Sequence, residues 1–428
     1  MTSTTLKATL LGAMAAISVA GVAFVSLPGV AEAGPTVEVL HYWTSGGESK
    51  AVLELKKEFQ AAGGTWVDSP VAGGGGDAQA TVLRSRVLAG NPPSVVQMKG
   101  PNIKDWAGQG VLNDIDEVGK AENWDNLLPP LLKDVVTYDG KYYAAPVNIH
   151  RVNWIWANPA VLAKAGVAMP TTWDEFNAAA DKLKAMGITP LAHGGQPWQD
   201  ATVFETVVLG IGGPAFYHKA LVELDDATLR SDTMVKVFDE MRKLRGYVDD
   251  GFSNRDWNLA TSMVMNGQAA FQIMGDWAKG EFTAAGKKPG TDFVCAPTPG
   301  AQGYLLNTDS FVFFSVKNGG PDVVAGQKLF AKLIMGADFQ EIFNLYKGSI
   351  PARLGVKRDK FDACAIRSMD DLDLSIKNNS LEPSMAHEMA TSGAVRGAIL
   401  DVVTQHFNSD MSSPAAATKL ADAIAGAK

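Results

Sequence analysis

The chain has 428 residues, of which 46% are hydrophobic and 20% charged, and its formal net charge is −8. This length is enough for two domains rather than one. The acidic balance excludes a nucleic-acid-binding protein and a basic protein of the membrane surface. The six histidines are scattered, so no Cys/His group has the spacing of a zinc site. Tryptophan, with 10 residues, outnumbers tyrosine, with 8, and such a surplus suits ligands with flat apolar faces.

An apolar segment without charges runs from Ala8 to Val30 and is followed by Ala31-Glu32-Ala33. Together with Lys7 before it, this pattern is typical of a secretory signal peptide that is cleaved near Ala33. An uncleaved membrane anchor is the alternative. No later segment has the length and composition of a membrane span. We therefore expect residues 1–33 to be a signal peptide and the mature chain to be exported.

The chain contains two cysteines, Cys295 and Cys364. In the oxidising compartment that an exported chain reaches, a small even number of cysteines favours a single disulfide. Two free, buried thiols are the alternative.

The first strand of the mature chain ends in an aromatic pair. Residues 37–43 form a short apolar run, typical of a buried strand, that finishes with Tyr42-Trp43. After a polar loop, a helical pattern places three apolar residues on one face: Val52, Leu55 and Phe59. A strand tip with aromatic and hydroxyl groups beside a helix N-terminus faces the ligand in open α/β sheets. We therefore expect Trp43 near a ligand; a position in the core is the alternative.

Strands and helices continue to alternate up to about residue 112. Residues 65–67 and 94–98 predict strands, and Lys99 follows the second of them. Residues 77–90 predict a helix that ends at a glycine, and another helix begins at 103–108. This β-α-β-α order predicts a largely parallel sheet with helices on both faces.

The run Gly73 to Gly76 is the one low-complexity segment. Its place before a helix permits a phosphate-binding reading. However, it lacks the Lys-Ser/Thr pair of a P-loop and the spacing of a dinucleotide fingerprint. We therefore expect a flexible loop.

A second α/β block follows an extended segment at 142–147. Thr172 and Glu175 form a capping-box pattern at a helix start. The predicted strands are 154–156, 293–297 and 310–315. The predicted helices are 159–165, 173–186, 323–335 and the tail from His387 to Lys428, and helical patterns dominate from residue 187 to Phe282. Two α/β blocks joined by extended crossings suggest two lobes around a cleft.

Five motifs, in this order and spacing, resemble the extracytoplasmic solute-binding proteins of ABC transporters that carry sugars. They are residues 90–96 (Gly-Asn-Pro-Pro-Ser-Val-Val), 138–146 (Tyr-Asp-Gly-Lys-Tyr-Tyr-Ala-Ala-Pro), Asn158-Pro159, 170–176 (Pro-Thr-Thr-Trp-Asp-Glu-Phe), and 267–271 (Gly-Gln-Ala-Ala-Phe) with 274–277 (Met-Gly-Asp-Trp) after it. The resemblance covers essentially the whole mature chain. It implies an α/β fold of two lobes, each a sheet flanked by helices, with the ligand cleft between them.

Within that family the chain is most similar to the glucose- and mannose-binding proteins of Gram-negative bacteria. The motifs of this subgroup are residues 42–48, 148–154, 307–311 and 346–351, with His387 after them. The resemblance implies that the sugar touches five of its residues: Trp43, Lys99, Asp309, Lys347 and His387. The chain departs from the subgroup at Tyr42, where its members have a second Trp. A tyrosine still stacks on a sugar, so this change leaves the hexose and anomer open.

The chemistry of these residues suits a pyranose. Aromatic rings cover the C–H faces of the sugar, and charged groups form strong hydrogen bonds with its hydroxyls. Asp309 can accept from two hydroxyls, and Lys99 and Lys347 are rotatable donors. We include Tyr42, Glu48 and Trp277 among the candidate ligand-binding residues. Glu48 can equally be a helix first-turn acid, Trp277 a core residue, Lys347 a helix C-terminal cation, and His387 a surface helix residue.

The resemblance implies a binding protein and not an enzyme, with no cofactor and no metal. We expect lobe 1 to comprise 34–146 and 308–352, and lobe 2 to comprise 147–307 and 353–428, with crossings near Pro146, Asn307 and Pro351. The expected function is capture of a monosaccharide such as glucose by hinge closure and its delivery to an ABC transporter permease. We expect a periplasmic monomer that binds no nucleic acid.

Two other functions remain open from the sequence. An oligosaccharide or another polyol could occupy the same fold. A secreted glycosidase with two carboxylates across the cleft is the enzymatic alternative. The chain shows no G-x-S-x-G nucleophile motif, and release of reducing sugar from aryl glycosides would distinguish an enzyme from a receptor.

Overall fold

A computed structural model describes residues 34–428 of the chain, so the predicted signal peptide lies outside the described residues. The first sheet has five strands in the order β2-β1-β3-β13-β6. Its strands are β1 (Thr36–His41), β2 (Thr65–Pro70), β3 (Val95–Met98), β6 (Ala144–Pro146) and β13 (Ser310–Phe313). Strand β1 pairs in parallel with β2 and β3, and β13 runs antiparallel between β3 and β6. The parallel part is the sheet predicted from the N-terminal block.

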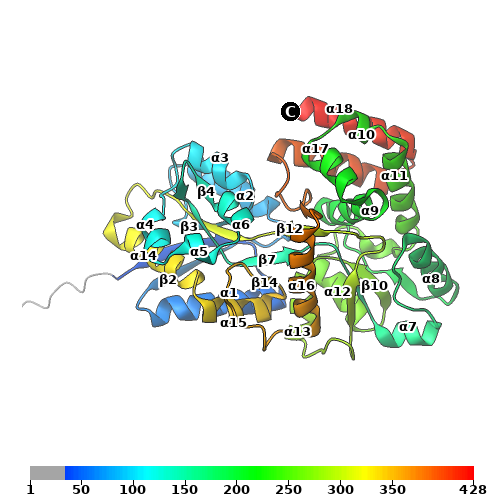
Figure 1. The fold of residues 1–428 in the computed structure, drawn as a ribbon, viewed down its shortest axis with the longest axis horizontal. Helices are drawn as coiled ribbons and strands as arrows, with labels where there is room; N and C mark the ends of the chain where they lie inside the picture. The colour runs from blue at the N-terminus through cyan, green and yellow to red at the C-terminus, as the bar shows by residue number, and fades with distance from the viewer. Residues whose placement is uncertain (1–33) are drawn as a thin grey trace, which may run out of the picture. The chain divides into compact units, whose positions relative to one another are not determined.

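Helices cover both faces of this first sheet; in the view of Figure 1, α2 and α3 lie above it and α1 and α15 below. Helix α1 buries Val52, Leu55 and Phe59, the apolar face predicted from their spacing. The helices of this part are α1 (Gly46–Ala61), α2 (Asp77–Leu88), α3 (Asn102–Gly108), α4 (Asp116–Ala121), α5 (Trp124–Leu127), α6 (Pro130–Val136), α14 (Gly320–Ile334) and α15 (Ala337–Lys347). The small hairpin β4 (Thr137–Tyr138) and β5 (Lys141–Tyr142) lies beside them.

A second sheet and most of the remaining helices enclose a separate hydrophobic core. The sheet has the order β11-β8-β10-β9, with β8 (Trp154–Ala157), β9 (Thr189–Leu191), β10 (Ala269–Ile273) and β11 (Val294–Pro297). The helices are α7 (Pro159–Ala165), α8 (Trp173–Ala185), α9 (Pro197–Tyr217), η1 (His218–Val222), α10 (Asp226–Leu229), α11 (Asp232–Arg245), η2 (Asp250–Phe252), α12 (Trp257–Met265), α13 (Trp277–Ala284), α17 (Gly393–Phe407) and α18 (Ser413–Ala427). The predicted capping box is present at the N-terminus of α8: the Thr172 hydroxyl accepts from the Glu175 backbone N–H, and the Glu175 carboxylate accepts from the Thr172 backbone N–H.

A third sheet joins these two parts. Its strands, in the order β14-β7-β12-β15, are β7 (Asn148–Arg151), β12 (Tyr304–Asn307), β14 (Ile350–Pro351) and β15 (Leu381–Pro383). Strand β7 follows β6 directly, and β12 is followed by β13, so the chain passes between the first two sheets through this third one. Figure 1 shows β7 and β12 between the two groups of helices. The fold is therefore a mixed α/β architecture of two lobes.

Parts of the predicted secondary structure were wrong. The region from 187 to 282, predicted as mainly helical, contains β9 and β10, and His387 lies in a turn before α17. All five residues of β10 are buried. A short strand that is buried on both faces is continuously apolar and shows no period of two, so its sequence resembles a buried helix segment.

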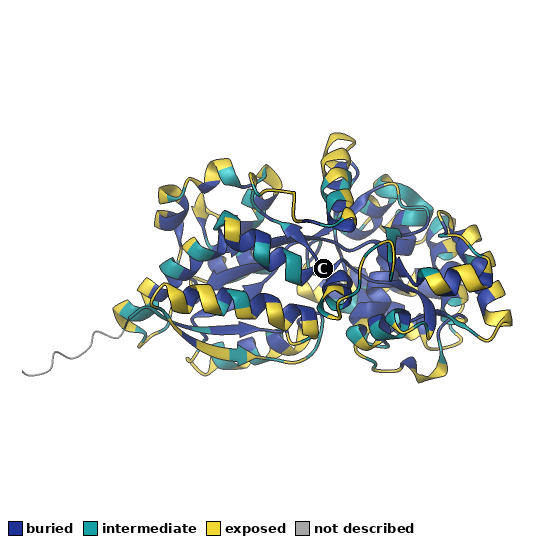
Figure 2. Ribbon diagram, turned by 90° about the horizontal axis from the view of Figure 1, so that it is seen from below, coloured by how far each residue is buried: buried dark blue, intermediate teal, exposed yellow. Residues whose placement is uncertain are grey.

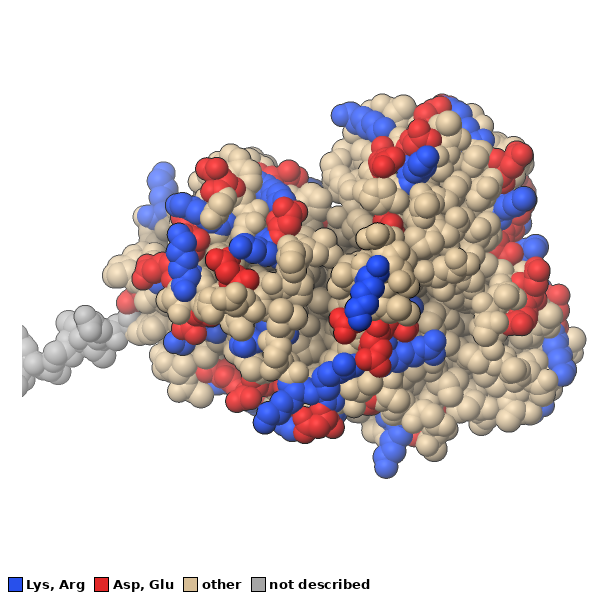
Figure 3. All heavy atoms as spheres, in the orientation of Figure 1, with Lys and Arg blue, Asp and Glu red and all other residues tan. Residues whose placement is uncertain are grey.

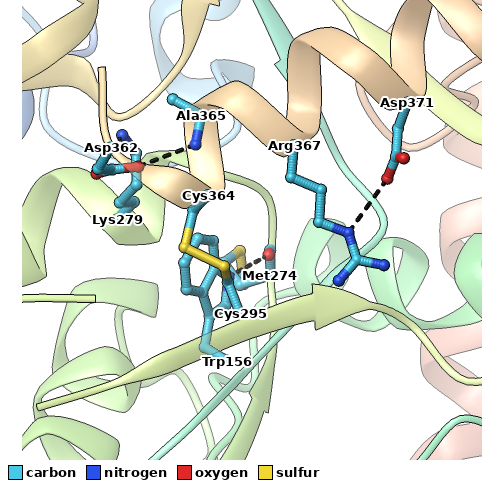
Figure 4. Close-up of a disulfide and its surroundings, with 9 residues drawn as sticks. All are labelled: Trp156, Met274, Lys279, Cys295, Asp362, Cys364, Ala365, Arg367 and Asp371. Atoms are coloured by element: carbon cyan, nitrogen blue, oxygen red, sulfur yellow. Dashed lines mark hydrogen bonds and ion pairs between the residues drawn. A yellow bond between two sulfur atoms is a disulfide. The ribbon is translucent and has the colours of Figure 1, made fainter. Parts of the chain in front are cut away.

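Cys295 and Cys364 form a disulfide, with Cα atoms 6.2 Å apart. The bond joins β11, an edge strand of the second sheet, to the first turn of α16 (Ala363–Lys377), as Figure 4 shows. At the start of α16, Asp362 accepts from the backbone N–H of Ala365 and binds the buried Lys279 at 3.0 Å. The predicted disulfide is confirmed, and it fixes the segment that returns from the third crossing to the second core.

Most large apolar side chains of the described part are buried in the cores, and a few, such as Leu88, are exposed singly. Figure 2 shows buried residues along the strands and the inner faces of the helices. Basic and acidic side chains are interspersed on the face seen in Figure 3. Within residues 34–428, no helix is both long and apolar enough to cross a membrane, and no group of three metal-ligating side chains occurs.

Candidate functional site

A small cavity lies where the first, second and third sheets meet. Its empty volume is about 320 Å³, including space that opens to solvent, and the centre of a water molecule has only about 20 Å³ in which to move. The cavity is thus narrow in this conformation, and it still opens to solvent. Its walls are formed by Tyr42, Glu48, Gly74, Gly75, His150, Trp198, Trp257, Trp277, Asn307, Asp309, Lys347 and His387.

Three tryptophans of the second core form the aromatic walls of the cavity. Trp198, Trp257 and Trp277 each lie in the first turn of a helix, α9, α12 and α13 respectively. The Trp198 and Trp277 rings both contact the His387 ring, with centroids 5.9 Å and 4.9 Å away. Three helix starts therefore place three flat apolar faces around one space.

The first lobe contributes a buried ion pair. Lys347, the last residue of α15, places its Nζ 2.8 Å from the Glu48 carboxylate in the first turn of α1. Lys347 Nζ also lies 5.4 Å from the centre of the Trp43 ring and 6.0 Å from that of Trp277. Ser45 donates to the other Glu48 oxygen. Helix α1 thus presents an acid, already paired with a lysine, at the cavity.

Asp309, between β12 and β13, is surrounded by hydrogen-bond donors. Its Oδ1 accepts from Gln97 Nε2 at 3.1 Å and from the Tyr42 hydroxyl at 3.4 Å. Its Oδ2 lies 3.0 Å from Asn148 Nδ2 and 2.9 Å from His150 Nε2. Burial raises the pKa of Asp309, but His150 and, at longer range, Lys347 and Lys99 outweigh it and hold the pKa well below its usual range.

These contacts also correct one part of the sequence argument. A carboxylate has about four acceptor positions, and protein groups approach all four of Asp309. Asp309 can therefore offer fewer acceptor positions to two ligand hydroxyls than its residue type suggested. Among the described residues it forms no ion pair with Lys99 or Lys347.

The cavity also contains an acceptor that no described residue satisfies. Asn307 Oδ1, at the end of β12, is buried and has no hydrogen-bond partner among residues 34–428. An unpaired buried carbonyl oxygen costs roughly 1–3 kcal/mol. A ligand that donates a hydroxyl proton to it would recover that free energy.

His387 is held neutral beside the cavity. Burial, followed by Lys99 and Arg396, lowers the pKa of His387 well below its usual value. Its Nε2 lies 3.0 Å from the Thr202 hydroxyl on α9. The residue lies in a buried turn and not on a surface helix, so the surface-helix reading was wrong.

Six of the eight predicted site residues line the cavity: Tyr42, Glu48, Trp277, Asp309, Lys347 and His387. Trp43 packs behind Lys347 against Phe311 and Phe343 in the first core. Lys99 lies beyond Tyr42, where it donates to the Gly75 carbonyl and lines an adjoining crevice, whose empty volume of about 1170 Å³ likewise includes space that opens to solvent. The expectation that all eight touch a ligand stays a prediction.

Sequence reasoning missed six residues of the cavity wall: Gly74, Gly75, His150, Trp198, Trp257 and Asn307. Both glycines are in the run predicted as a flexible loop. A Cβ atom at either would come within 2.8 Å of the Trp198 ring, so the absence of side chains lets this loop lie against the cavity. His150 and Asn307 lie within the sequence motifs 148–154 and 307–311 that the chain shares with the family. Their place in these motifs was the signal that could have identified them as site residues.

Two α/β lobes with an aromatic and polar cavity where they meet are typical of a receptor for a small solute. Residues 43–311 match the bacterial extracellular solute-binding proteins, and the chain belongs to this family. A "Probable sugar-binding periplasmic protein" of Brucella suis biovar 1 (strain 1330) is 51% identical over 424 residues, which is 99% of each chain. A protein of the same name from Rhizobium meliloti (strain 1021) is 52% identical over 93% of this chain and 95% of its own.

Solved structures show the same fold at low identity. The bacterial solute receptor AcbH superposes with a TM-score of 0.75 at 19% identity, over 90% of this chain and 97% of its own. A chitin oligosaccharide binding protein superposes with a TM-score of 0.78 at 19% identity, over 92% and 99%. These likenesses confirm the two-lobed fold. The family consists of solute-binding proteins, so the chain is a receptor and not an enzyme.

Proposed function

We propose that the protein binds a neutral monosaccharide of the glucose type and delivers it to the permease of an ABC transporter. The observation that carries the proposal is the lining of the cavity: three tryptophans and a set of buried polar groups surround one narrow space, which has to widen to admit a sugar ring. The names of the Brucella and Rhizobium relatives support a sugar ligand. Their names also support a periplasmic location, which agrees with the predicted signal peptide.

The polarity of the cavity favours an uncharged ligand. Glu48 and Lys347 neutralise each other, and His387 is neutral. Asp309 is paired with His150. What remains for a ligand is hydrogen bonding to the Asn307 carbonyl, to the Glu48–Lys347 ion pair, to the His387 ring and to Asp309, which shares its oxygens with protein donors. Hydroxyl groups of a pyranose can both donate and accept, whereas an anion or a cation would leave its own charge unpaired.

We propose that Tyr42, Glu48, Asn307, Asp309, Lys347 and His387 contact the hydroxyls and that Trp198, Trp257 and Trp277 cover the faces of the ring. In this proposal, lobe 1 comprises residues 34–146 and 308–352, and lobe 2 comprises 147–307 and 353–428. The sugar contacts residues of both lobes, so its binding favours the closed state by differential contact. The protein acts as a monomer, and its closed form is what the permease recognises.

A specific observation favours an oligosaccharide as the second candidate. Tyr42 lines both the cavity and the larger adjoining crevice, which contains Lys99 and Arg396. A small movement of Tyr42 would join the two spaces, and a second sugar ring would fit the polar crevice.

Calorimetric titration with D-glucose, D-mannose, D-galactose, maltose and cellobiose tests the proposal. We expect one hexose to bind to the parent protein, and Asn307→Ala to bind that hexose about tenfold or more weakly, since it loses an otherwise unpaired acceptor worth roughly 1–3 kcal/mol. Asn408→Ala, at the exposed end of α17, is the matched control and should bind like the parent. Binding of a disaccharide more tightly than any hexose would replace the proposal with the second candidate.

A further inference from the structure

His150 occupies a central place in the molecule. It lies on β7, the strand by which the chain first crosses from one lobe to the other, and it is 1% exposed. Its Nδ1 contacts the carboxylate of Asp276, the residue before α13, and its Nε2 lies 2.9 Å from Asp309 Oδ2. The imidazole ring therefore lies between two carboxylates, one from each proposed lobe.

Hydrogen-bond chemistry determines how many protons this arrangement needs. A neutral imidazole has one N–H group, so one ring nitrogen would direct a lone pair at a carboxylate oxygen. Such a nitrogen could accept from Asn148 Nδ2, which is 2.9 Å away, but Asp309 Oδ2 lies equally close to it. An imidazolium donates to both carboxylates and leaves no lone pair facing an anion.

The two carboxylates are placed as acceptors and not as proton carriers. Asp276 Oδ2 accepts from the Arg151 backbone N–H at 2.9 Å, while its Oδ1 contacts His150. Asp309 accepts from Gln97, Tyr42 and Asn148 in addition to His150. A proton on either carboxyl group would displace one of these donors, so it belongs on the ring.

The other charges near the ring act against this protonation. Burial lowers the pKa of His150, and so does Lys347; the carboxylates of Asp276 and Asp309 outweigh both, and the pKa is raised above its usual value. His387 also interacts with His150; its pKa is lowered well below its usual value, chiefly by burial, so it adds no opposing charge. The direction of the pKa thus agrees with the geometry.

We propose that His150 is a buried imidazolium held by Asp276 and Asp309, and that it is a positioning residue which aligns Asp309 at the cavity wall and joins the two lobes at their first crossing. The effect on ligand affinity rests on the proposed function; the charge state of the ring does not. As the pH rises and the proton is lost, Asp309 loses a donor and the two carboxylates repel each other. Affinity for the sugar then falls.

Nitrogen-15 NMR of the histidine side chains tests the charge state without any ligand. The parent protein contains six histidines, all within the described residues. We expect one ring to keep both nitrogens protonated at pH 8, where a free histidine is neutral, and its signals to be absent from His150→Gln. If all six rings are neutral at pH 8, or if the imidazolium persists in His150→Gln, the proposal is wrong.

The affinity experiment uses a matched pair of buried histidines. We expect His150→Gln to bind the sugar at least tenfold more weakly at pH 6.5, and its affinity to change less than the parent's between pH 6.5 and 9. His406, on α17, is fully buried with no hydrogen bond to either ring nitrogen among the described residues, and its pKa is lowered to about 4, chiefly by burial. His406→Gln should keep the parent's pH dependence.

The experiments also allow for a variant that does not fold and for a parent protein that binds no sugar. If His150→Gln does not fold, Asp276→Asn replaces it, because it removes one of the two carboxylates and should abolish the imidazolium at pH 8. If the parent binds no sugar, the proposed function fails while the NMR result still decides the state of His150. An affinity that is equal in parent and His150→Gln at every pH would overturn the positioning role.

Discussion

The buried carboxyl of Glu205 does not line the cavity but binds the turn that carries His387. It lies on α9, and its oxygens accept from the Ser384 hydroxyl at 2.7 Å, the Tyr217 hydroxyl at 2.9 Å and the backbone N–H of Ala386 at 3.1 Å. These bonds hold the turn that carries His387 into the cavity wall. Burial raises the pKa of Glu205 to about 7, and the hydrogen bonds offset only part of that effect.

Glu205→Gln should therefore change how stability depends on pH. The carboxyl keeps its proton in the folded state after the unfolded state has lost it at about 4.5, so the parent's free energy of unfolding falls as the pH rises from about 4.5 to about 7. With about 1.4 kcal/mol per pKa unit, the shift from 4.5 to about 7 corresponds to a full contribution of roughly 3–4 kcal/mol. Glutamine does not titrate, so the variant should lack this decline. Urea unfolding at pH 4.5, 5.5, 6.5 and 7.5 measures it, and parallel curves for both proteins would contradict it.

At the residue scale, the sequence predicted polar groups better than aromatic ones. Asp309, Lys347 and Glu48 follow strand ends or lie at helix ends, where side chains can converge, and motifs of the family marked them. Trp198 and Trp257 were missed because an aromatic residue in the first turn of a helix usually belongs to the core. Trp43, predicted at the ligand, lies one layer behind the cavity. The distinction depends on which helix starts meet in space, and local sequence does not encode that.

At the scale of elements, glycines allow three helices to approach one another closely. A Cβ atom on Gly47 of α1 would lie 2.6 Å from the Gly280 carbonyl carbon in α13. A Cβ atom on Gly280 would lie 2.7 Å from the Tyr346 carbonyl oxygen in α15. The N–H of Gly47 also donates to Glu281 at 2.8 Å, which places an acid at the N-terminus of α1. Helices α1 and α15 belong to proposed lobe 1, and α13 to lobe 2.

Gly47→Ala should therefore hinder closure without unfolding the protein. Alanine suits a helix at least as well as glycine, so each lobe keeps its stability, but the added methyl group separates α1 from α13. We expect the affinity for the sugar to fall about tenfold or more and the ligand-free melting temperature to stay within a few degrees. Gly397→Ala on α17, where a Cβ atom meets nothing within 4 Å, is the control. A lower melting temperature with unchanged affinity would show that α1 and α13 stay in contact in every state.

The disulfide between Cys295 and Cys364 constrains two elements, β11 and α16, by a covalent bond. It joins residues 69 positions apart, and closing a loop of that length stabilises a fold by about 2–4 kcal/mol. The double variant Cys295→Ala, Cys364→Ala should lose about that much free energy of unfolding in urea while its sugar affinity stays within threefold. A loss of less than 1 kcal/mol, or a large loss of affinity, would contradict a purely stabilising role.

The predicted elements were most accurate where helix signals were local. Helix α7 matches its predicted bounds, and the capping box before α8 is confirmed. Strands β7, β9, β10 and β12 were not predicted as strands. They are three to five residues long and mostly or wholly buried, so neither alternation nor length distinguishes them. Their identity as strands depends on partners that are distant in the sequence.

At the scale of the whole molecule, we expect the third sheet to determine how the proposed lobes move. Strand β7 pairs with β12 on one side and with β14 on the other, so the segments that connect the two parts form one sheet. Such a sheet bends as a unit, which makes rotation about it the expected motion. We expect this motion to widen the narrow cavity when a sugar enters.

Solution scattering should detect that motion. We expect the radius of gyration of the parent protein to decrease when saturating D-glucose, or the hexose that binds best, is added. Gly47→Ala should show a smaller decrease at the same occupancy, while Gly397→Ala should match the parent. An unchanged radius in the parent at saturation would contradict hinge closure and leave entry through local movement of Tyr42 as the route.

The bond between Cys295 and Cys364 has a further, mechanical consequence. Strand β13 and helices α14 and α15 lie between these two cysteines, so the second portion of proposed lobe 1 is enclosed in a covalent loop. When the chain is pulled from its two ends, tension bypasses that loop. Complete extension of the oxidised chain would therefore fall short of the reduced chain by roughly 230–250 Å, at 3.3–3.6 Å per residue over 69 residues. Helices α14 and α15 would unfold without being stretched.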